Sequence, residues 1–253
     1  MIHSVSSPLA AFVNRLNRRS QLTQQEQGAI LGLPFVKEHF QIHRDIVGLG
    51  ERVTCASYIE RGMVGRFEQN ADGQRQITAI YVPGDMANLQ TLVDPCASAA
   101  LQALSNVTVL RISHIALREV VRDYPALLGA FWRDCIIDAA LLSEWVANIG
   151  RRHARARLAH LMCEMAVRLG AKSGDSFAFH FPLTQQQLAD ATGLTSVHIN
   201  RVAKDLREDS LVEIGHGWVR VLNWKRLVKI ADFSEEYPLS DIPQTTADRS
   251  LAA

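Results

Sequence analysis

The stretch from Gln185 to Lys204 constrains the fold of this chain more than any other feature of the sequence. It has a small residue, Ala189, at its fifth position and a glycine, Gly193, at its ninth. A small residue lets two helices cross closely, and glycine accepts the positive φ of a tight turn without a steric penalty. Ile199 and Val202 supply apolar side chains for a small core between the two helices. The spacing therefore predicts a helix-turn-helix.

The second helix of this motif is expected to begin at Thr195 or Ser196, because either side chain can cap its first N–H groups. Residues near its N-terminal end would reach base edges in the major groove of DNA. The planar guanidinium of Arg201 matches the O6 and N7 acceptors of guanine, although it could instead contact phosphate alone. The residues predicted to read bases are Ser196, Val197, Asn200 and Arg201. Those predicted to position the chain on phosphates are Thr184, Gln185, Thr195, His198, Lys204 and His216.

The distribution of charge agrees with a DNA-binding segment. Residues 151–230 contain 13 Lys and Arg against seven Asp and Glu, whereas the whole chain has a formal net charge of +1. A basic segment in a near-neutral chain is typical of a phosphate-binding module. After Leu211, the pattern VEIGHGWVRVL indicates two short strands that meet around His216, and residues 223–233 are expected to form a closing helix. Together these elements predict a winged helix-turn-helix.

The first half of the chain has a different pattern. Between about residues 38 and 112, short β-rich runs are separated by turn signals such as Gly62 and Asn70–Gly73. Several short strands at this spacing indicate a sandwich or a barrel-like roll. Residues 8–31 have apolar positions at helical spacing and are expected to precede the roll as helices. The predicted fold class is therefore α+β.

A long helix is predicted from Pro125 to about Arg152, because no further proline interrupts this segment and apolar residues recur every seven positions. The apolar stripe could pack antiparallel within one chain or form a two-stranded seam between two copies. We favour the seam between copies. The residues assigned to it are Leu128, Phe131, Cys135, Ala139, Leu142, Trp145, Val146 and Ile149.

Other classes of site are disfavoured by spacing. The four cysteines stand singly, and His198 has no second His, Cys or carboxylate at ligand spacing, so no metal site is expected. Cys135 could be a buried thiol or could form a disulfide across the predicted seam. No catalytic arrangement is recognisable, so the chain is not expected to be an enzyme. It has neither a bilayer-length apolar run nor a signal-peptide pattern, which predicts a cytoplasmic protein without a membrane partner.

The order of roll, long helix and winged helix-turn-helix is similar to that of the cyclic-AMP receptor protein / fumarate-nitrate reductase regulator (Crp/Fnr) family of bacterial transcription regulators. The resemblance rests on three segments, QITAIYVPGDM, YPALL and LTQQQLADATGLTSVHINRVAKDLR. Two further segments, EWVANIGRR and GLTSVHINR, together resemble those of an alphaproteobacterial subgroup. The resemblance implies a jelly-roll-like double-stranded β-helix, a homodimer formed through the long helix, and guanine reading by Arg201. It also implies contact with RNA polymerase and an effector of unknown identity.

Two departures from the family pattern concern its ligands. Members that bind cyclic nucleotides carry Gly-Glu-Leu after a Gly-Asp turn and then an Arg-Ser pair, whereas this chain reads GDMANL from Gly84 and has Ala97 before Ser98. Ala97 cannot pair a cyclic phosphate, and a buried anion without a cation is costly. Cyclic AMP is therefore not expected to bind. Residues 1–54 contain no cysteine, so neither an iron–sulfur cluster nor a haem is expected, and no cofactor is predicted.

The predicted domains are an N-terminal helical segment (1–34), a β-roll resembling a cyclic nucleotide-binding domain (35–124), a dimerisation helix (125–152), a winged helix-turn-helix (153–233) and a polar tail expected to be disordered (234–253). The predicted function is that of a sequence-specific DNA-binding transcription regulator, acting as a homodimer on an inverted-repeat operator in double-stranded DNA. The alternative is a small-molecule or redox sensor or scaffold whose head domain contacts protein rather than DNA.

Overall fold

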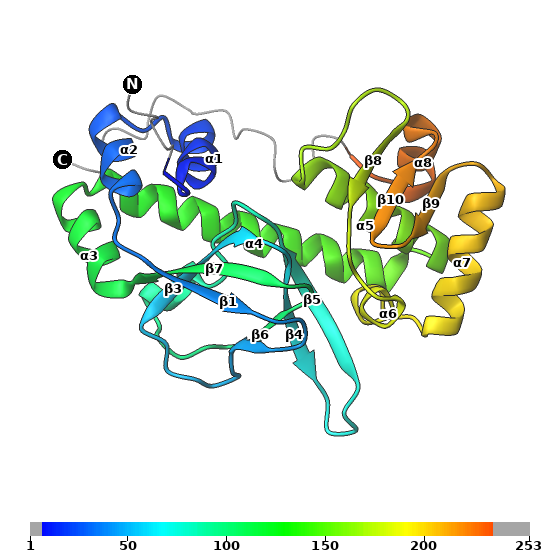
Figure 1. Ribbon diagram of the computed structural model, residues 1–253, viewed down its shortest axis with the longest axis horizontal. Coiled ribbons are helices and arrows are strands. Elements are labelled where there is room, and N and C mark those ends of the chain that lie inside the picture. The colour runs from blue at the N-terminus through cyan, green and yellow to red at the C-terminus, as the bar shows by residue number, and fades with distance from the viewer. Residues whose placement is uncertain (1–6, 235–253) are drawn as a thin grey trace. The chain divides into compact units, whose positions relative to one another are not determined.

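The computed structural model describes residues 7–234, which form two compact units (Figure 1). The first unit contains residues 7–64 and 83–139, and the second contains residues 65–82 and 140–234. Beyond residue 234, the tail predicted to be disordered lies outside the described residues. Within residues 7–234, no helix is both long and apolar enough to cross a membrane.

Two helices precede the roll, as predicted. Helix α1 (Ala10–Ser20) buries Phe12, Val13 and Leu16, which lie on one helical face. Helix α2 (Gln24–Leu31) begins with a capping box in which the Thr23 side chain accepts a hydrogen bond from the Glu26 N–H and the Glu26 side chain accepts one from Thr23. The chain turns between the helices at Gln21, which has a φ of 45°.

The roll consists of short antiparallel strands in two sheets. One sheet has the order β1-β7-β3 and the other has the order β2-β6-β4-β5, so most neighbouring strands are distant in sequence. In the first sheet, Val109 of β7 lies opposite both Glu38 of β1 and Ile59 of β3. The strand bounds are β1 Val36–Phe40, β2 Asp45–Val47, β3 Cys55–Arg61, β4 Val64–Gln69, β5 Arg75–Tyr81, β6 Ala100–Ala103 and β7 Val107–Ser113.

Strand β1 begins before the β-rich region expected between about residues 38 and 112. The cause is visible in β1, whose sequence VKEHF does not alternate between apolar and polar residues. All five of its residues are exposed or half-buried, so backbone pairing with β7 rather than burial of side chains defines the strand. Period-two patterning cannot detect such a strand.

The core of the first unit joins α1, the roll and the first half of helix α4 (Ala126–Arg151). The ring of Phe12 stacks on Phe131 of α4 at 6.2 Å and meets Tyr58 of β3 edge-on at 6.3 Å. A short 3-10 helix η1 (Leu89–Leu92) and helix α3 (His114–Asp123) complete this unit. The long helix predicted after Pro125 is confirmed as α4.

The second unit contains the winged helix-turn-helix. Its elements are α5 Ala154–Arg168, β8 Phe177–His180, α6 Gln185–Thr192, α7 Ser196–Glu208, β9 Val212–Gly215, β10 Trp218–Val221 and α8 Trp224–Ala231. Strand β10 pairs antiparallel with both β8 and β9, which gives the order β8-β10-β9. Leu206, Val219 and Leu227, from α7, β10 and α8, are fully buried. The predicted hairpin and closing helix are therefore confirmed.

Candidate DNA interface and sensor cavity

The first helix of the helix-turn-helix, α6, begins with a complete capping box. The Thr184 hydroxyl accepts a hydrogen bond from the Gln187 N–H at 3.2 Å, and the Gln187 side chain accepts one from the Thr184 N–H at 2.8 Å. This reciprocal cap satisfies two N–H groups that the helix itself leaves without acceptors. Thr184 and Gln185 remain exposed, as a contact to phosphate would require.

The turn between the helices has the geometry that its sequence predicted. Gly193 ends α6 with a φ of 65° and donates its N–H to the Ala189 carbonyl. A Cβ at this position would lie 3.2 Å from the Ile149 side chain, so both backbone conformation and space favour glycine. Ala189 is 1% exposed, which is consistent with close helix crossing.

The second helix, α7, is held to the first by caps and a shared core. Thr195 is its N-cap, because its hydroxyl accepts a hydrogen bond from the His198 N–H at 3.2 Å. The Ser196 hydroxyl donates to the Gln186 side chain of α6 at 2.8 Å. Ile199 and Val202 are buried at 1% and 3% exposure, so the start of α7 is fixed relative to α6.

The opposite face of α7 is open to solvent. Val197 is 81% exposed, and Asn200 and Arg201 are exposed as well. Within residues 7–234, no side chain pairs with the Arg201 guanidinium, so its fork of donors remains available. Of the four residues predicted to read bases, Ser196 differs, because it is half-buried and bonded to Gln186. The base-reading roles remain predictions.

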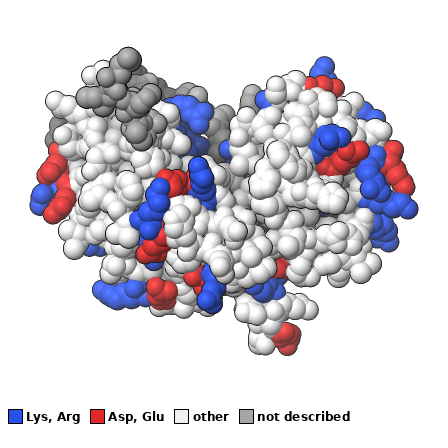
Figure 2. Space-filling view, in the orientation of Figure 1, with Lys and Arg blue, Asp and Glu red and all other residues white. Residues whose placement is uncertain are grey.

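Charged side chains gather over α7 (Figure 2). The exposed cations of this helix are Arg201, Lys204 and Arg207. Lys204 lies 3.6 Å from Glu208, and both side chains are more than half exposed, so this pair is weak and can exchange for a phosphate contact. His198 is half-buried beside the N-cap.

The wing is a tight hairpin between β9 and β10. His216 and Gly217 form its two-residue turn with φ values of 51° and 76°, the signature of a type I′ turn. The Gly217 carbonyl accepts a hydrogen bond from the Phe181 N–H at 2.7 Å, which ties the wing to the segment leading into α6. His216 is exposed at the tip, where the phosphate contact was predicted.

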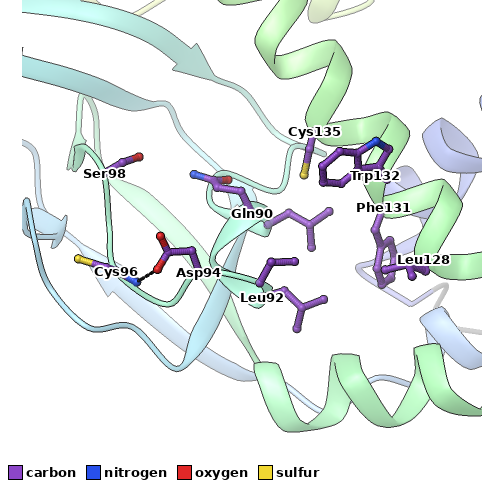
Figure 3. Close-up of a pocket in the computed structure, with 11 residues that line it drawn as sticks. Gln90, Leu92, Asp94, Cys96, Ser98, Leu128, Phe131, Trp132 and Cys135 are labelled. Carbon is purple, nitrogen blue, oxygen red and sulfur yellow. Dashed lines mark hydrogen bonds between the residues drawn. The ribbon is translucent and has the colours of Figure 1, made fainter.

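A cavity of about 270 Å³ lies in the first unit between η1, the loop that follows it and α4. In Figure 3, Leu128, Phe131, Trp132 and Cys135 line it from α4, opposite Gln90 and Leu92. Asp94, whose carboxylate accepts a hydrogen bond from the Cys96 N–H at 3.2 Å, is the one charged residue among those that line it. Burial raises the pKa of the Cys135 thiol to about 11, with further contributions from Asp134 and Asp138.

Two family descriptions match this chain. Residues 37–124 match the cyclic nucleotide-binding domain, and residues 156–230 match the Crp-like helix-turn-helix domain. The chain belongs to the Crp/Fnr family of transcription regulators. Its architecture of a β-roll, a long helix and a DNA-binding helix-turn-helix is that of the family.

Three relatives illustrate this membership. The nitrogen fixation regulation protein FixK of Bradyrhizobium diazoefficiens is 26% identical over 182 residues, which cover 72% of this chain and 76% of FixK. The fumarate and nitrate reduction regulatory protein of Vibrio cholerae is 20% identical over 200 residues, covering 79% and 80% of the two chains. The structure of FixK2 from Bradyrhizobium japonicum matches with a TM-score of 0.71 and 20% identity, covering 84% of this chain and 100% of FixK2.

The roll does not fit the cyclic nucleotide that its domain name implies. Ala97 is 5% exposed, and both its N–H and its carbonyl are used in backbone hydrogen bonds to Glu51 and Gly50. Asn88 is 4% exposed and bonds the backbone of Ser57 and Cys55. No Lys or Arg is among the described residues that line the cavity, so an anionic cyclic phosphate would find no counter-charge there.

The predicted seam on α4 needs correction at two positions. Phe131 and Trp145 are 3% and 5% exposed because they pack inside the chain, so assigning them to a contact with a second copy was wrong. Cys135, Leu142 and Ile149 are half-buried, whereas Leu128, Ala139 and Val146 are exposed as a seam requires. The exposed stripe also includes two residues that the prediction left out, Trp132 at 62% and Ile136 at 47%.

No sequence pattern predicted the cavity between η1 and α4, because its lining comes from two segments 30 or more positions apart. No pattern predicted the role of Gln186 either, because it depends on a hydrogen bond from Ser196, ten positions away. Within the part of the chain that the structure describes, no three His, Cys, Asp or Glu side chains come together as a metal-binding group.

Proposed function

We propose that this Crp/Fnr regulator works as a homodimer whose two winged heads read an inverted repeat in double-stranded DNA. The supporting observation is the exposed N-terminal half of α7, where Val197, Asn200 and Arg201 project from a helix whose other face is buried. A helix fixed in this way presents its side chains to base edges with little loss of conformational freedom on binding. The bacterial cytoplasm, where the DNA lies, is the proposed location.

The exposed stripe on α4 supports the dimer. Trp132, Ile136, Ala139, Ser143 and Val146 are all exposed, and their spacing alternates between four and three residues. This alternation is the spacing of a two-stranded coiled-coil seam. Four of the five are apolar, and pairing two copies of α4 would remove them from water. Cys135 is half-buried beside this stripe rather than centred on it.

Two-fold symmetry determines the form of the operator. Two identical heads related by a two-fold axis read half-sites that are inverted and about one helical turn, or 10 to 10.5 base pairs, apart. In each half-site, Arg201 would donate two hydrogen bonds to a guanine. Thr184, Gln185, Thr195, His198, Lys204 and His216 would hold the head on the backbone without reading sequence.

The cavity supports an effector other than a cyclic nucleotide. Its walls are mostly apolar, and the one charged residue that lines it, Asp94, is negative. A neutral, largely apolar small molecule would fit such walls, whereas an anion would lose its hydration without gaining a cation. Bound there, it would contact α4 at Trp132 and Cys135, beside the exposed stripe, and could therefore bias dimer geometry. RNA polymerase is the proposed protein partner at promoters.

The test is selection of bound fragments from sheared bacterial genomic DNA by the purified full chain. We expect an enriched inverted repeat with a guanine in each half-site, bound more tightly than a scrambled duplex at the same salt concentration. Equal affinity for the enriched and scrambled duplexes would contradict sequence-specific regulation. Calorimetry with cyclic AMP should show no saturable binding, and micromolar binding would contradict the assignment of the cavity.

A further inference from the structure

Trp218, the first residue of β10, is an aromatic side chain that the fold leaves in solvent. It is 53% exposed, and β10 alternates so that Val219 and Val221 are buried while Trp218 and Arg220 face outward. Its ring meets the exposed His180 imidazole of β8 edge-on, with centroids 5.5 Å apart. A tryptophan contributes to folding mainly through burial, so a half-exposed one on the central strand of a sheet suggests a role in binding.

Among the described residues from 153 to 234, Val197 and Trp218 are the most exposed large apolar side chains, at 81% and 53%. Val197 lies at the start of α7, where base contacts are proposed. Trp218 directly follows the wing turn formed by His216 and Gly217. The two exposed apolar side chains of this part of the chain therefore lie on the two elements for which DNA contacts are proposed.

Hydrogen bonds connect these two elements into one surface. The Phe181 N–H donates to the Gly217 carbonyl at 2.7 Å, and three residues further along the chain Thr184 caps α6. Gln186, in the first turn of α6, accepts a hydrogen bond from Ser196 of α7 at 2.8 Å. The wing, the start of α6 and the start of α7 thus form a continuous path, and Trp218 lies at its wing end.

The charged residues beside Trp218 on the wing form an ion pair, which is compatible with an uncharged contact to DNA. Arg220, which shares the outward face of β10, lies 3.4 Å from Glu213 of β9, and the two charges offset each other. The outward face of β10 therefore carries a paired cation, whereas α7 carries the exposed cations Arg201, Lys204 and Arg207. An indole ring offers an apolar face to deoxyribose and one N–H donor to a phosphate oxygen.

We propose that Trp218, backed by His180, binds the sugar–phosphate backbone of duplex DNA beside the groove that α7 enters. The proposal rests on the DNA-binding function proposed above and adds an uncharged anchor to it. Because indole has no charge, it increases affinity without releasing counterions from DNA. Because it touches no base edge, it increases affinity equally for every sequence.

The test measures binding of the full chain to a labelled mixed-sequence duplex of about 30 base pairs, long enough for two half-sites and their flanks. Trp218→Ala should weaken binding about tenfold for each protomer that contacts the duplex, the loss expected for one hydrogen bond to a charged group. The slope of log affinity against log salt should stay the same. Lys204→Ala is the matched comparison, because loss of one phosphate-binding cation from each protomer should reduce that slope by about 2.

Tryptophan emission gives an independent readout. DNA should quench part of the emission of the wild-type chain, and Trp218→Phe should remove that quenching. Trp224→Phe, which replaces a buried tryptophan of the same unit, should leave the quenching in place. The unfolding midpoint of Trp218→Ala should match the wild type, because the side chain is more than half exposed.

Unchanged DNA affinity in Trp218→Ala, while wild-type binding is intact, would overturn the proposal and assign Trp218 to a protein partner such as RNA polymerase. A weaker affinity accompanied by a reduced salt slope or by a lower unfolding midpoint would overturn it too, because the substitution would then act through charge or through folding of the wing. A wild-type chain that binds no duplex at all overturns the proposed function itself, and this proposal with it.

Discussion

The indole N–H of Trp145 donates a hydrogen bond to the Glu164 carboxylate at 2.8 Å. Trp145 is 5% exposed and Glu164 is 1% exposed, so the bond joins α4 to α5 in the interior of the second unit. Glu164 also pairs with Arg168 of its own helix at 3.0 Å. A carboxylate this deeply buried depends on its donors, because an unsatisfied buried charge is costly.

The two tryptophans of α4 should therefore respond differently to substitution. Trp145→Phe removes a donor from a buried carboxylate and should lower the free energy of unfolding by about 1–3 kcal/mol, with the dimer intact. Trp132→Glu places a charge on the exposed stripe and should shift the chain toward monomer. Sedimentation and denaturant unfolding would measure both effects. Ile115→Glu, an exposed isoleucine on α3, is the control and should leave the oligomeric state unchanged.

Arg201→Ala should relax specificity more than it weakens overall binding. Loss of a bidentate guanine contact should cost roughly 1–3 kcal/mol and remove preference at one base pair in each half-site. Competition between the enriched operator and variants at that base pair would measure the change. Arg207→Ala removes an exposed arginine from the last turn of the same helix and should leave base preference intact. Equal preference for guanine in the wild type and Arg201→Ala would assign Arg201 to phosphate alone.

Gly193→Ala should destabilise the head. Its φ of 65° is unfavourable for a residue with a Cβ by about 1–2 kcal/mol, and the new methyl group would meet the Ile149 side chain at 3.2 Å. Both effects destabilise the turn that positions α7. The free energy of unfolding and the affinity for DNA should therefore both decrease. Gly28→Ala in α2 is the matched control, because nothing lies within 4 Å of its Cβ and its φ is not positive. It should be neutral or stabilise by about 0.5–1 kcal/mol.

How far the sequence could predict these features depends on how far apart along the chain the interacting residues lie. The helix-turn-helix was predictable because Ala189, Gly193 and Ile199 are constrained by neighbours within one short motif. The seam on α4 was only partly predictable, because a heptad repeat shows the period of a stripe but not which side of the helix the rest of the chain covers. Trp145 and Trp132 both fit an apolar helix, and only the position of Glu164 distinguishes them.

Acid should destabilise the second unit through His160. Burial, together with the positive charge of Arg152, lowers the pKa of His160 to about 4 from its ordinary 6.5. The unfolded chain therefore takes up a proton near pH 6.5 that the folded chain does not accept until about pH 4. Stability from this group is complete above pH 6.5 and falls by roughly 3 kcal/mol as the pH drops through that window.

The measurement for His160 is the free energy of unfolding between pH 7.5 and 4, compared with that of His160→Gln. Glutamine keeps a donor for the Ala231 carbonyl, which lies 3.4 Å from His160 Nδ1, but it does not titrate. The wild type should lose stability relative to the variant as the pH falls. Parallel curves would show that His160 does not resist protonation in the fold.

The buried ion pairs between α1 and α4 should be strongly coupled. Arg19 and Asp134 are 4% and 8% exposed and lie 3.4 Å apart, and Arg15 lies 3.1 Å from the same carboxylate. Burial lowers the pKa of Arg19 to about 10, which reflects how poorly this site tolerates an uncompensated cation. Arg15 also pairs with Asp85, so replacing Asp134 alone removes the carboxylate that Arg15 and Arg19 share.

Asp134→Leu should therefore cost about 3–5 kcal/mol of unfolding free energy, because Arg19 and Arg15 lose a carboxylate that they share beside the core. Arg19→Met combined with Asp134→Leu should cost less than the sum of the single substitutions, by about 0.5–3 kcal/mol, because the apolar pair replaces charges that must be desolvated on folding. Denaturant unfolding of the four proteins in this cycle measures the coupling. Additive losses would mean that Arg19 and Asp134 do not stabilise each other and that Arg15 and Asp85 provide the compensation at this site.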